Sequence, residues 1–280
     1  LAAGQRGGTT LSTGVARTGR PGFLASGAAL GGAFAGAFAI AGAAQIVSSV
    51  TQYLSSAITS ASDLSETQSK VGQIFGDSAA GVQDFARTAA SRLGQSQQTV
   101  LDGASTFGIF GQAAGLAGED LTGFSTEMVT LATDLASFNN TSPEDAINAI
   151  GSALRGESEP IRAYGVLLDD ATLKARAFEL GIYDGTDALT PQQRVLAAHA
   201  EILAQTSTQQ GDFERTSEGM ANKQRILTAE MENTKAEIGT ALLPVMNDLL
   251  GVFADEAVPI LQELAGWFME NKDEIGAMVL

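Results

Sequence analysis

Mostly apolar residues recur at spacings of three and four along residues 227–249, the most regular pattern in this chain. The pattern consists of Leu227, Met231, Thr234, Ile238, Ala241, Val245 and Leu249. On an α-helix these positions share one face, so they predict a helix that packs along a neighbour, as in a coiled-coil seam. Pro244 lies inside the pattern and predicts a kink or a new helix start near Leu243. Pro259 predicts the start of a further short amphipathic helix.

The segment "NTSPEDAINAIGSALRGE" (140–157) carries explicit signals for the start and end of a helix. Ser142 is suited to cap free backbone N–H groups, and Pro143 fits the first helical position, where its missing donor is not needed. Gly156 permits the left-handed conformation that ends many helices. The apolar face of this predicted helix consists of Ile147, Ile150 and Leu154.

A second segment, "LTPQQRVLAAHAEILAQT" (189–206), repeats the same start signals. Thr190 is the predicted N-cap, Pro191 the first helical residue and Gln193 the partner that completes a capping box. The predicted apolar face comprises Val195, Leu196, His199, Ile202 and Leu203.

Glycines are frequent between residues 72 and 123, and each costs a helix interior about 1 kcal/mol relative to alanine. This region is therefore predicted to form short helices joined by turns. The chain as a whole is predicted to be all-α. Short helices and helical hairpins occupy the middle, longer amphipathic helices lie toward the C-terminus, and an Ala/Gly-rich apolar helix lies near the N-terminus.

The charge of the chain is uneven. The 280 residues carry a net charge of −16, yet residues 1–62 contain Arg6, Arg17 and Arg20 and no acidic residue. This change predicts a boundary near Asp63. We expect four parts: a flexible basic Gly-rich tail (1–21), an apolar helical segment (22–62), a helical core (63–218) and long coiled-coil-like helices kinked at Pro244 (219–280). The acidic excess argues against a sequence-specific grip on nucleic acid, which requires clustered Lys and Arg.

Residues 22–47, "GFLASGAALGGAFAGAFAIAGAAQIV", contain no charged side chain. As one helix they would span roughly 39 Å, enough to cross the ~30 Å hydrocarbon core of a membrane. Two GxxxG spacings would let helix backbones approach closely, and their members are Gly27, Gly31, Gly32 and Gly36. Insertion into a membrane, close packing among copies in an assembly, and disorder all remain open interpretations.

Candidate catalytic chemistry is sparse. Cysteine is absent, His199 is the single histidine, and no phosphate-binding loop, HExxH, GxSxG or EF-hand motif occurs. Adjacent Asp169 and Asp170 point apart on a helix, so capping or solvated roles are predicted for them. "YDGTD" (183–187) is interpreted as a turn and His199 as a structural histidine. The expectation is that the chain is not an enzyme and holds no metal or cofactor.

Five segments occur in an order that resembles the core region of tail tape measure proteins of long-tailed bacteriophages. They are "ETQSKVGQIFGDSAAGVQDFARTAASRLGQS" (66–96), "LATDLASFNNTSPEDAINAIGSALRGESEPIRAYGVLLDD" (131–170), "LTPQQRVLAAHAEILAQT" (189–206), "GDFERTSEGMANKQRIL" (211–227) and "IGTALLPVMNDLL" (238–250). The run of GESEPIRAYGV, GDFERT and LLP is more specific than any one of these segments. The resemblance extends over roughly residues 64–265.

The resemblance implies a structural virion protein inside the tail tube that determines tail length and assists genome ejection. Its implied partners are the tail tube protein, tail tip or baseplate proteins, tail assembly chaperones and parallel copies of itself. The alternative is a membrane-inserting pore component that delivers DNA across the host envelope, with the host membrane as partner. The acidic charge suits a lumen that DNA must pass, although solubility explains it equally well.

The motif residues of this resemblance have a structural interpretation. Those singled out are Gly156, Glu157, Pro160, Gly165, Gly211, Gly239 and Pro244. Gly156 and Pro160 are predicted to end one helix and start the next, and Gly165 to allow a turn or a close backbone contact. A ruler requires one long uninterrupted helix, and this chain has too many Gly and Pro interruptions for that. Because it also begins with Leu1, the chain is expected to be the compact core of a longer protein.

Overall fold

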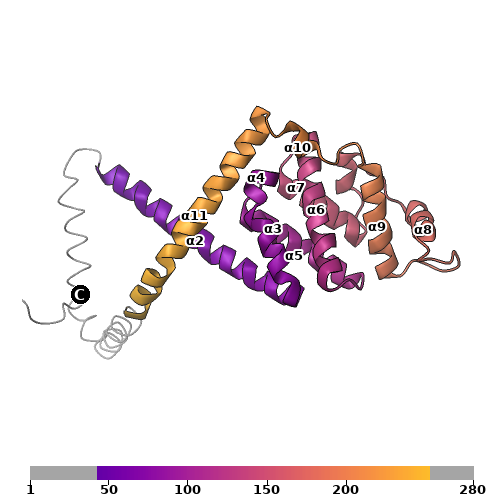
Figure 1. The fold of residues 1–280 in the computed structure, drawn as a ribbon, viewed down its shortest axis with the longest axis horizontal. Helices are drawn as coiled ribbons and strands as arrows, with labels where there is room; N and C mark the ends of the chain where they lie inside the picture. The colour runs from indigo at the N-terminus through magenta and orange to yellow at the C-terminus, as the bar shows by residue number, and fades with distance from the viewer. Residues whose placement is uncertain (1–42, 253–280) are drawn as a thin grey trace, which may run out of the picture. The chain divides into compact units, whose positions relative to one another are not determined.

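The computed structural model describes residues 43–252 and places side chains for residues 52–248. Its elements are α2 (Ala43–Phe75), η1 (Gly76–Ser78), α3 (Ala79–Arg87), α4 (Ala89–Leu93), α5 (Gln97–Ala113), α6 (Gly118–Asn139), α7 (Pro143–Arg155), η2 (Pro160–Tyr164), α8 (Asp170–Glu179), α9 (Pro191–Gln205), α10 (Asp212–Thr216) and α11 (Met220–Val252) (Figure 1). No strand occurs within 43–252, so this part of the chain confirms the predicted all-α class.

Internal contacts divide the chain into residues 1–52 and 53–280, and the description that follows concerns the second unit. The predicted boundary near Asp63 falls inside α2, so the change in charge there is a change of composition along one helix. Residues 22–42, including Gly27, Gly31, Gly32 and Gly36, lie outside the described residues, as does the helix predicted after Pro259. In residues 43–252, no helix combines the length and the apolar character that a membrane crossing requires.

Helix α5 is the centre of the core, where it contacts α3, α6, α7 and α9. Its buried side chains include Leu101 and Phe107, which pack with Met128, Leu135 and Ile150 of the surrounding helices. Burial of such side chains contributes roughly 1.5–3 kcal/mol each, so this cluster supplies much of the stabilisation.

The prediction of short helices between residues 72 and 123 is wrong for α5. This helix has 17 residues although Gly103, Gly108 and Gly111 lie inside it. All three glycines are buried against neighbouring helices: a Cβ at Gly103 would lie 2.9 Å from Ile147 Cδ1, and one at Gly108 would lie 2.7 Å from the Phe75 ring. The stabilisation from close packing offsets the low helix propensity of glycine.

The predicted helix starts in the middle of the chain are confirmed. Helix α7 begins at Pro143, and the Ser142 hydroxyl accepts a hydrogen bond from the Asp145 backbone N–H at 3.1 Å. Helix α9 begins at Pro191 with the capping box formed by Thr190 and Gln193. The predicted apolar face of α7 is buried, and that of α9 is buried or partly buried.

Helix α11 crosses α2 at Gly239 (Figure 1). A Cβ at this position would overlap the backbone carbonyl of Ala57 and would lie 2.8 Å from the Ala61 Cβ. The two helix backbones therefore approach as closely as a glycine–alanine contact allows. Helix α11 continues through Pro244. Of the two alternatives predicted for this proline, a kink or a new helix start near Leu243, the new start is therefore wrong.

Substituting Gly239 with alanine is expected to lower the free energy of unfolding by about 1–3 kcal/mol, because overpacking at this crossing forces the helices apart. Gly123→Ala in α6 is the matched control, since nothing lies within 4 Å of its Cβ position. The control should raise stability by about 0.5–1 kcal/mol through helix propensity. Urea denaturation followed by circular dichroism measures both effects, and equal effects of the two substitutions would contradict the close crossing.

Candidate functional site

Polar side chains from four segments meet at the C-terminal end of α6. We call this cluster the polar junction, and its members are Asp134, Ser137, Asn139, Thr141, Tyr164, Gln209, Asp212, Thr216, Asn222 and Arg225. Helix α6 ends here because Asn140 adopts a left-handed conformation with φ 53°. Asparagine enters this region more readily than most side chains, and the change of direction leads the chain into α7.

Asp134 fixes the start of α10. Its side chain is buried, and its two carboxylate oxygens accept hydrogen bonds from the backbone N–H groups of Gly211 at 2.7 Å and Phe213 at 3.1 Å. Burial raises the pKa of Asp134, because desolvation of the charged form outweighs the stabilisation from these two donors. The neighbouring carboxylate of Asp212 raises the pKa further. The carboxylate thus holds a loop that has left-handed backbone at Gly211 (φ 73°).

Ser137 and Asn222 join three helices. The Ser137 hydroxyl donates to Asp212 Oδ2 at 2.7 Å, and Asn222 Nδ2 donates to Ser137 Oγ at 3.0 Å and to Thr216 Oγ1 at 2.8 Å. Asn222 is only 4% exposed, so these bonds compensate for the burial of its amide. Together they attach the first turn of α11 to the end of α6.

Arg225 caps the end of α6. Its Nη2 donates to the backbone carbonyls of Ala136 at 3.3 Å and Thr141 at 2.9 Å, while Nη1 donates to Asn222 Oδ1 at 2.8 Å. A helix C-terminus has unpaired carbonyls and a partial negative charge, so a guanidinium is stabilising there. This contact sets where α11 lies on the core.

Tyr164 brings the η2 segment into the junction. Its hydroxyl lies 3.0 Å from Thr141 Oγ1, and its backbone carbonyl accepts from Gln209 Nε2 at 2.8 Å. Asn139 Nδ2 donates to Gln209 Oε1 at 2.8 Å, which closes the link to α6. Burial of the ring raises the pKa of Tyr164.

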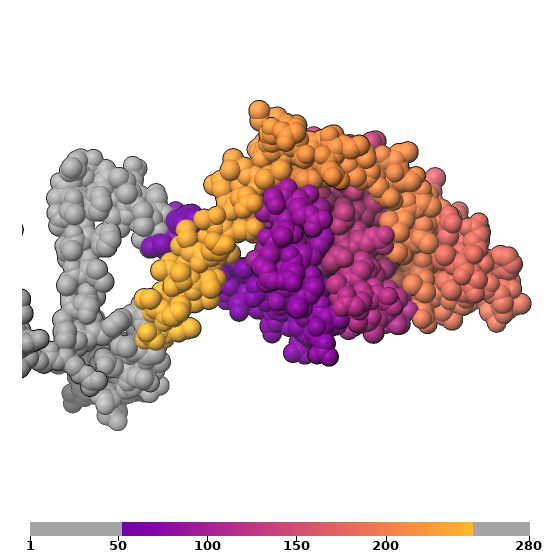
Figure 2. Space-filling view, in the orientation of Figure 1, coloured from indigo at the N-terminus to yellow at the C-terminus, as the bar shows by residue number. Residues whose placement is uncertain are grey.

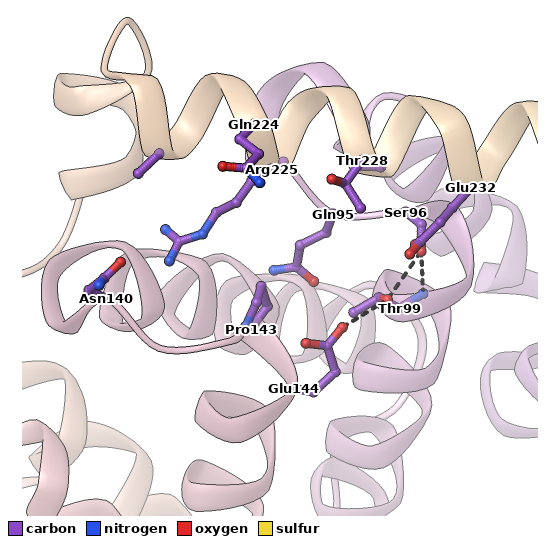
Figure 3. Close-up of a pocket in the computed structure, with 13 residues that line it drawn as sticks. Gln95, Ser96, Thr99, Asn140, Pro143, Glu144, Gln224, Arg225, Thr228 and Glu232 are labelled. Atoms are coloured by element: carbon purple, nitrogen blue, oxygen red, sulfur yellow. Dashed lines mark hydrogen bonds between the residues drawn. The ribbon is translucent and has the colours of Figure 1, made fainter.

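A cavity of about 400 Å³ lies beside the junction, between the start of α5, the start of α7 and α11 (Figure 3). Its labelled lining comprises Gln95, Ser96, Thr99, Asn140, Pro143, Glu144, Gln224, Arg225, Thr228 and Glu232. The Ser96 hydroxyl caps α5 by accepting from the Thr99 backbone N–H, and the Thr99 hydroxyl donates to Glu144 Oε1 at 3.2 Å. The Ser96 hydroxyl thus serves a helix end and the Thr99 hydroxyl binds a carboxylate, and no histidine that could activate them as nucleophiles lines the cavity.

The structure disperses the predicted motif residues over several turns. Gly156 (φ 102°) ends α7, Pro160 begins η2, and Gly165 (φ 80°) ends it. No atom lies within 4 Å of a Cβ position at Gly165, so this glycine makes no close backbone contact. Of the two predicted roles, it has that of a turn residue. Glu157 lies 3.7 Å from the exposed Arg155 guanidinium.

Of the predicted motif residues, only Gly211 contacts the polar junction directly, through Asp134. Gly239 forms the crossing with α2, and Pro244 lies within α11. Sequence reasoning missed Asp134, Asn222 and Arg225. One signal was present for Asp134: it is the only charged residue in the run "LATDLASF" (131–138), of which residues 131–136 are buried.

The other candidate residues have the capping and structural roles that were predicted. The Asp169 carboxylate caps α8 by accepting from the Thr172 backbone N–H at 2.7 Å, and Asp170 pairs with Arg194 at 2.9 Å. These contacts lower the pKa of each carboxyl. His199 Nε2 lies 2.9 Å from Glu127 Oε2. Among residues 43–252, no group of three or more His, Cys, Asp or Glu side chains is placed to hold a metal ion.

Comparison with known proteins finds no family model, no curated protein and no solved structure that matches this chain.

Replacing Asp134 with asparagine is expected to lower the free energy of unfolding by about 1–3 kcal/mol, because the amide can accept from only one of the two buried N–H groups. The folded-state pKa of Asp134 is raised, so the folded chain holds this proton to a higher pH than the unfolded chain. The advantage of wild type over the variant should therefore be larger near pH 4 than at pH 7. Denaturation at both pH values measures it.

Asp170→Asn is the control for this experiment, since its ion pairs are exposed to solvent and contribute little to stability. If the difference in free energy of unfolding between wild type and Asp134→Asn grew as the pH rises, it would contradict the raised pKa of the buried Asp134.

Gly165→Val is expected to destabilise the fold by about 1–2 kcal/mol, because a β-branched residue is strained in the left-handed conformation at φ 80°. Gly165→Asn is the matched variant and should cost less, since asparagine tolerates this conformation. Thermal unfolding of both variants measures the effect. An unchanged melting temperature for the valine variant would contradict the predicted backbone strain at this position.

Proposed function

We propose that this chain is the compact helical core of a phage tail tape measure protein, located in the tail tube of the virion, with a structural and not an enzymatic role. One observation carries this proposal. All members of the polar junction except Gln209 lie in two of the segments that resemble the tape measure family, 131–170 and 211–227. Two of the five resembling segments, distant in the sequence, therefore bind one another through the junction.

The contacts within the junction support a structural role. Its side chains donate to and accept from each other and from helix-end backbone groups, as Asp134 and Arg225 illustrate. A catalytic site requires a nucleophile or base that is open to a substrate. Here the junction side chains hold the ends of α6, α10 and α11 against one another.

The lengths of the helices between α2 and α11 agree with a core. They have 5 to 22 residues, so the longest of them extends about 33 Å. Tail length would then be determined by a longer helical part of the parent protein, with this core contacting tail tube, tail tip and chaperone proteins. The membrane-pore alternative rests on the sequence of residues 22–47, most of which lie outside the described range.

Quantitative mass spectrometry of tailed particles tests the proposed function. Peptides from residues 63–252 should be present in intact particles and depleted from particles that have ejected their DNA, because the tube lumen must be cleared for the genome. A tail tube peptide measured in the same samples is the control and should not change. Absence of the chain from intact tailed particles would overturn the proposal.

A further inference from the structure

The cavity of about 400 Å³ beside the polar junction contains a hydrogen-bond acceptor that the chain leaves unpaired (Figure 3). Gln95 lines this cavity and is only 2% exposed. Its Nε2 donates to the Thr133 hydroxyl, but no group among residues 52–248 donates to its buried Oε1. A buried acceptor without a donor is destabilising, so this oxygen would be stabilised by a ligand that donates to it.

The orientation of the Gln95 amide follows from its partner. The Thr133 hydroxyl donates its one proton to the Val129 carbonyl at 3.1 Å, so it can only accept from Gln95. The amide nitrogen therefore faces Thr133. Figure 3 shows the oxygen of the amide on the side of Thr99 and Glu144. A ligand that pairs with this oxygen must carry an N–H or O–H donor.

The charged side chains of the cavity wall favour a cation. They are Glu144 from the start of α7, and Glu232 and Arg225 from α11. Among residues 52–248 neither glutamate has an ion-pair partner. The Arg225 guanidinium, in contrast, is engaged by Asn222 and by the carbonyls at the end of α6. The wall thus offers two unpaired carboxylates together with the unpaired amide oxygen.

The rest of the wall includes apolar surface. Pro143 of α7 and Ala229 of α11 line the cavity, and such surface stabilises an alkyl group. Helix α11 itself lies along the surface of the molecule (Figure 2). Its apolar stripe faces outward and does not line the cavity, since Leu227 is 62% exposed and Met231 64%.

We propose that this cavity binds a primary alkylammonium ion. An ammonium group has three N–H donors and no acceptor, so it donates to Gln95 Oε1 and pairs with the carboxylates of Glu144 and Glu232. The alkyl chain packs against Pro143 and Ala229. A water molecule can also donate to Oε1, but it supplies no charge for the carboxylates, and an anion is repelled by them.

The site goes beyond the proposed function and does not depend on it. A bound ammonium ion connects the segment before α5 with α7 and α11, so it would stabilise the position of α11 on the core. Binding is measured on the purified chain without particles. Its failure would therefore leave the mass-spectrometry test of the proposed function unaffected.

NMR titration of the backbone amides of the full chain tests the proposal, with butylammonium chloride as the probe at low ionic strength. Saturable shifts are expected at Gln95, Ser96 and Ala229, with a Kd in the millimolar range because both carboxylates are exposed to solvent. Tetramethylammonium chloride has no N–H donor and should not give these shifts, nor should sodium phosphate. Absence of saturable butylammonium shifts, or equal binding of either control ion, overturns the proposal.

Gln95→Met tests the unpaired acceptor. The substitution removes the amide oxygen at similar volume, and the Thr133 hydroxyl keeps its bond to Val129. Butylammonium binding should weaken by at least about tenfold, as expected for the loss of a hydrogen bond from a charged donor. Circular dichroism checks that the variant keeps the wild-type fold. Wild-type affinity in the folded variant would overturn the proposed role of Gln95.

Glu144→Gln and Asp145→Asn form a matched pair that does not involve Gln95. Each removes one negative charge from an exposed side chain in the first turn of α7, but only Glu144 lines the cavity. Glu144→Gln should weaken butylammonium binding by about threefold, and Asp145→Asn should leave it unchanged. Equal effects would show that the charge of the helix end alone attracts the cation, which contradicts a site in the cavity.

A primary ammonium group is carried both by free alkylamines and by lysine side chains. Titration with a lysine that is acetylated and amidated at its backbone distinguishes these two sources. Tighter binding of butylammonium assigns the cavity to a small amine, and tighter binding of the capped lysine assigns it to a side chain of a partner protein.

Discussion

The hydrogen bonds from the Gly211 and Phe213 backbone to the buried carboxylate of Asp134 are the constraint on which the rest of the described fold depends. They hold the connection between α9 and α11 against the end of α6. Without them, two buried N–H groups would be unsatisfied at the point where the chain turns toward α11. Burial also disfavours the charged form of this carboxylate and raises its pKa. The hydrogen bonds from the two backbone donors offset part of this cost.

Two further contacts then determine the course of α11. Arg225 attaches its first turns to the carbonyls at the end of α6, and Gly239 allows it to cross α2 at backbone contact. Close packing against a glycine also occurs inside the core, where Ile147 packs against Gly103 of α5 and Phe75 packs against Gly108. In each of these cases the missing side chain gives the neighbouring helix its place, whereas glycines such as Gly156 and Gly165 serve turns with left-handed backbone.

These contacts give the residues of the polar junction a common interpretation. Ser137, Thr141 and Asn222 use their polar groups to satisfy helix ends and each other. Each of these residues has a hydrogen-bond partner far away in the sequence, so together they constrain how the helix ends meet. A protein that works by assembly requires this kind of constraint, since its outer faces must be presented at defined positions.

Local chemistry in the sequence determined the helical class, the starts of α7 and α9 at Ser142 and Thr190, and the left-handed end at Gly156. It also determined that α11 has an apolar stripe, because capping and periodicity depend only on neighbouring residues. Tertiary structure alone decided that α5 stays helical through its glycines, that Asp134 meets Gly211, and that the stripe of α11 faces outward. These outcomes depend on contacts between residues tens of positions apart, and helical periodicity indicates that a stripe exists but not which of its possible partners covers it.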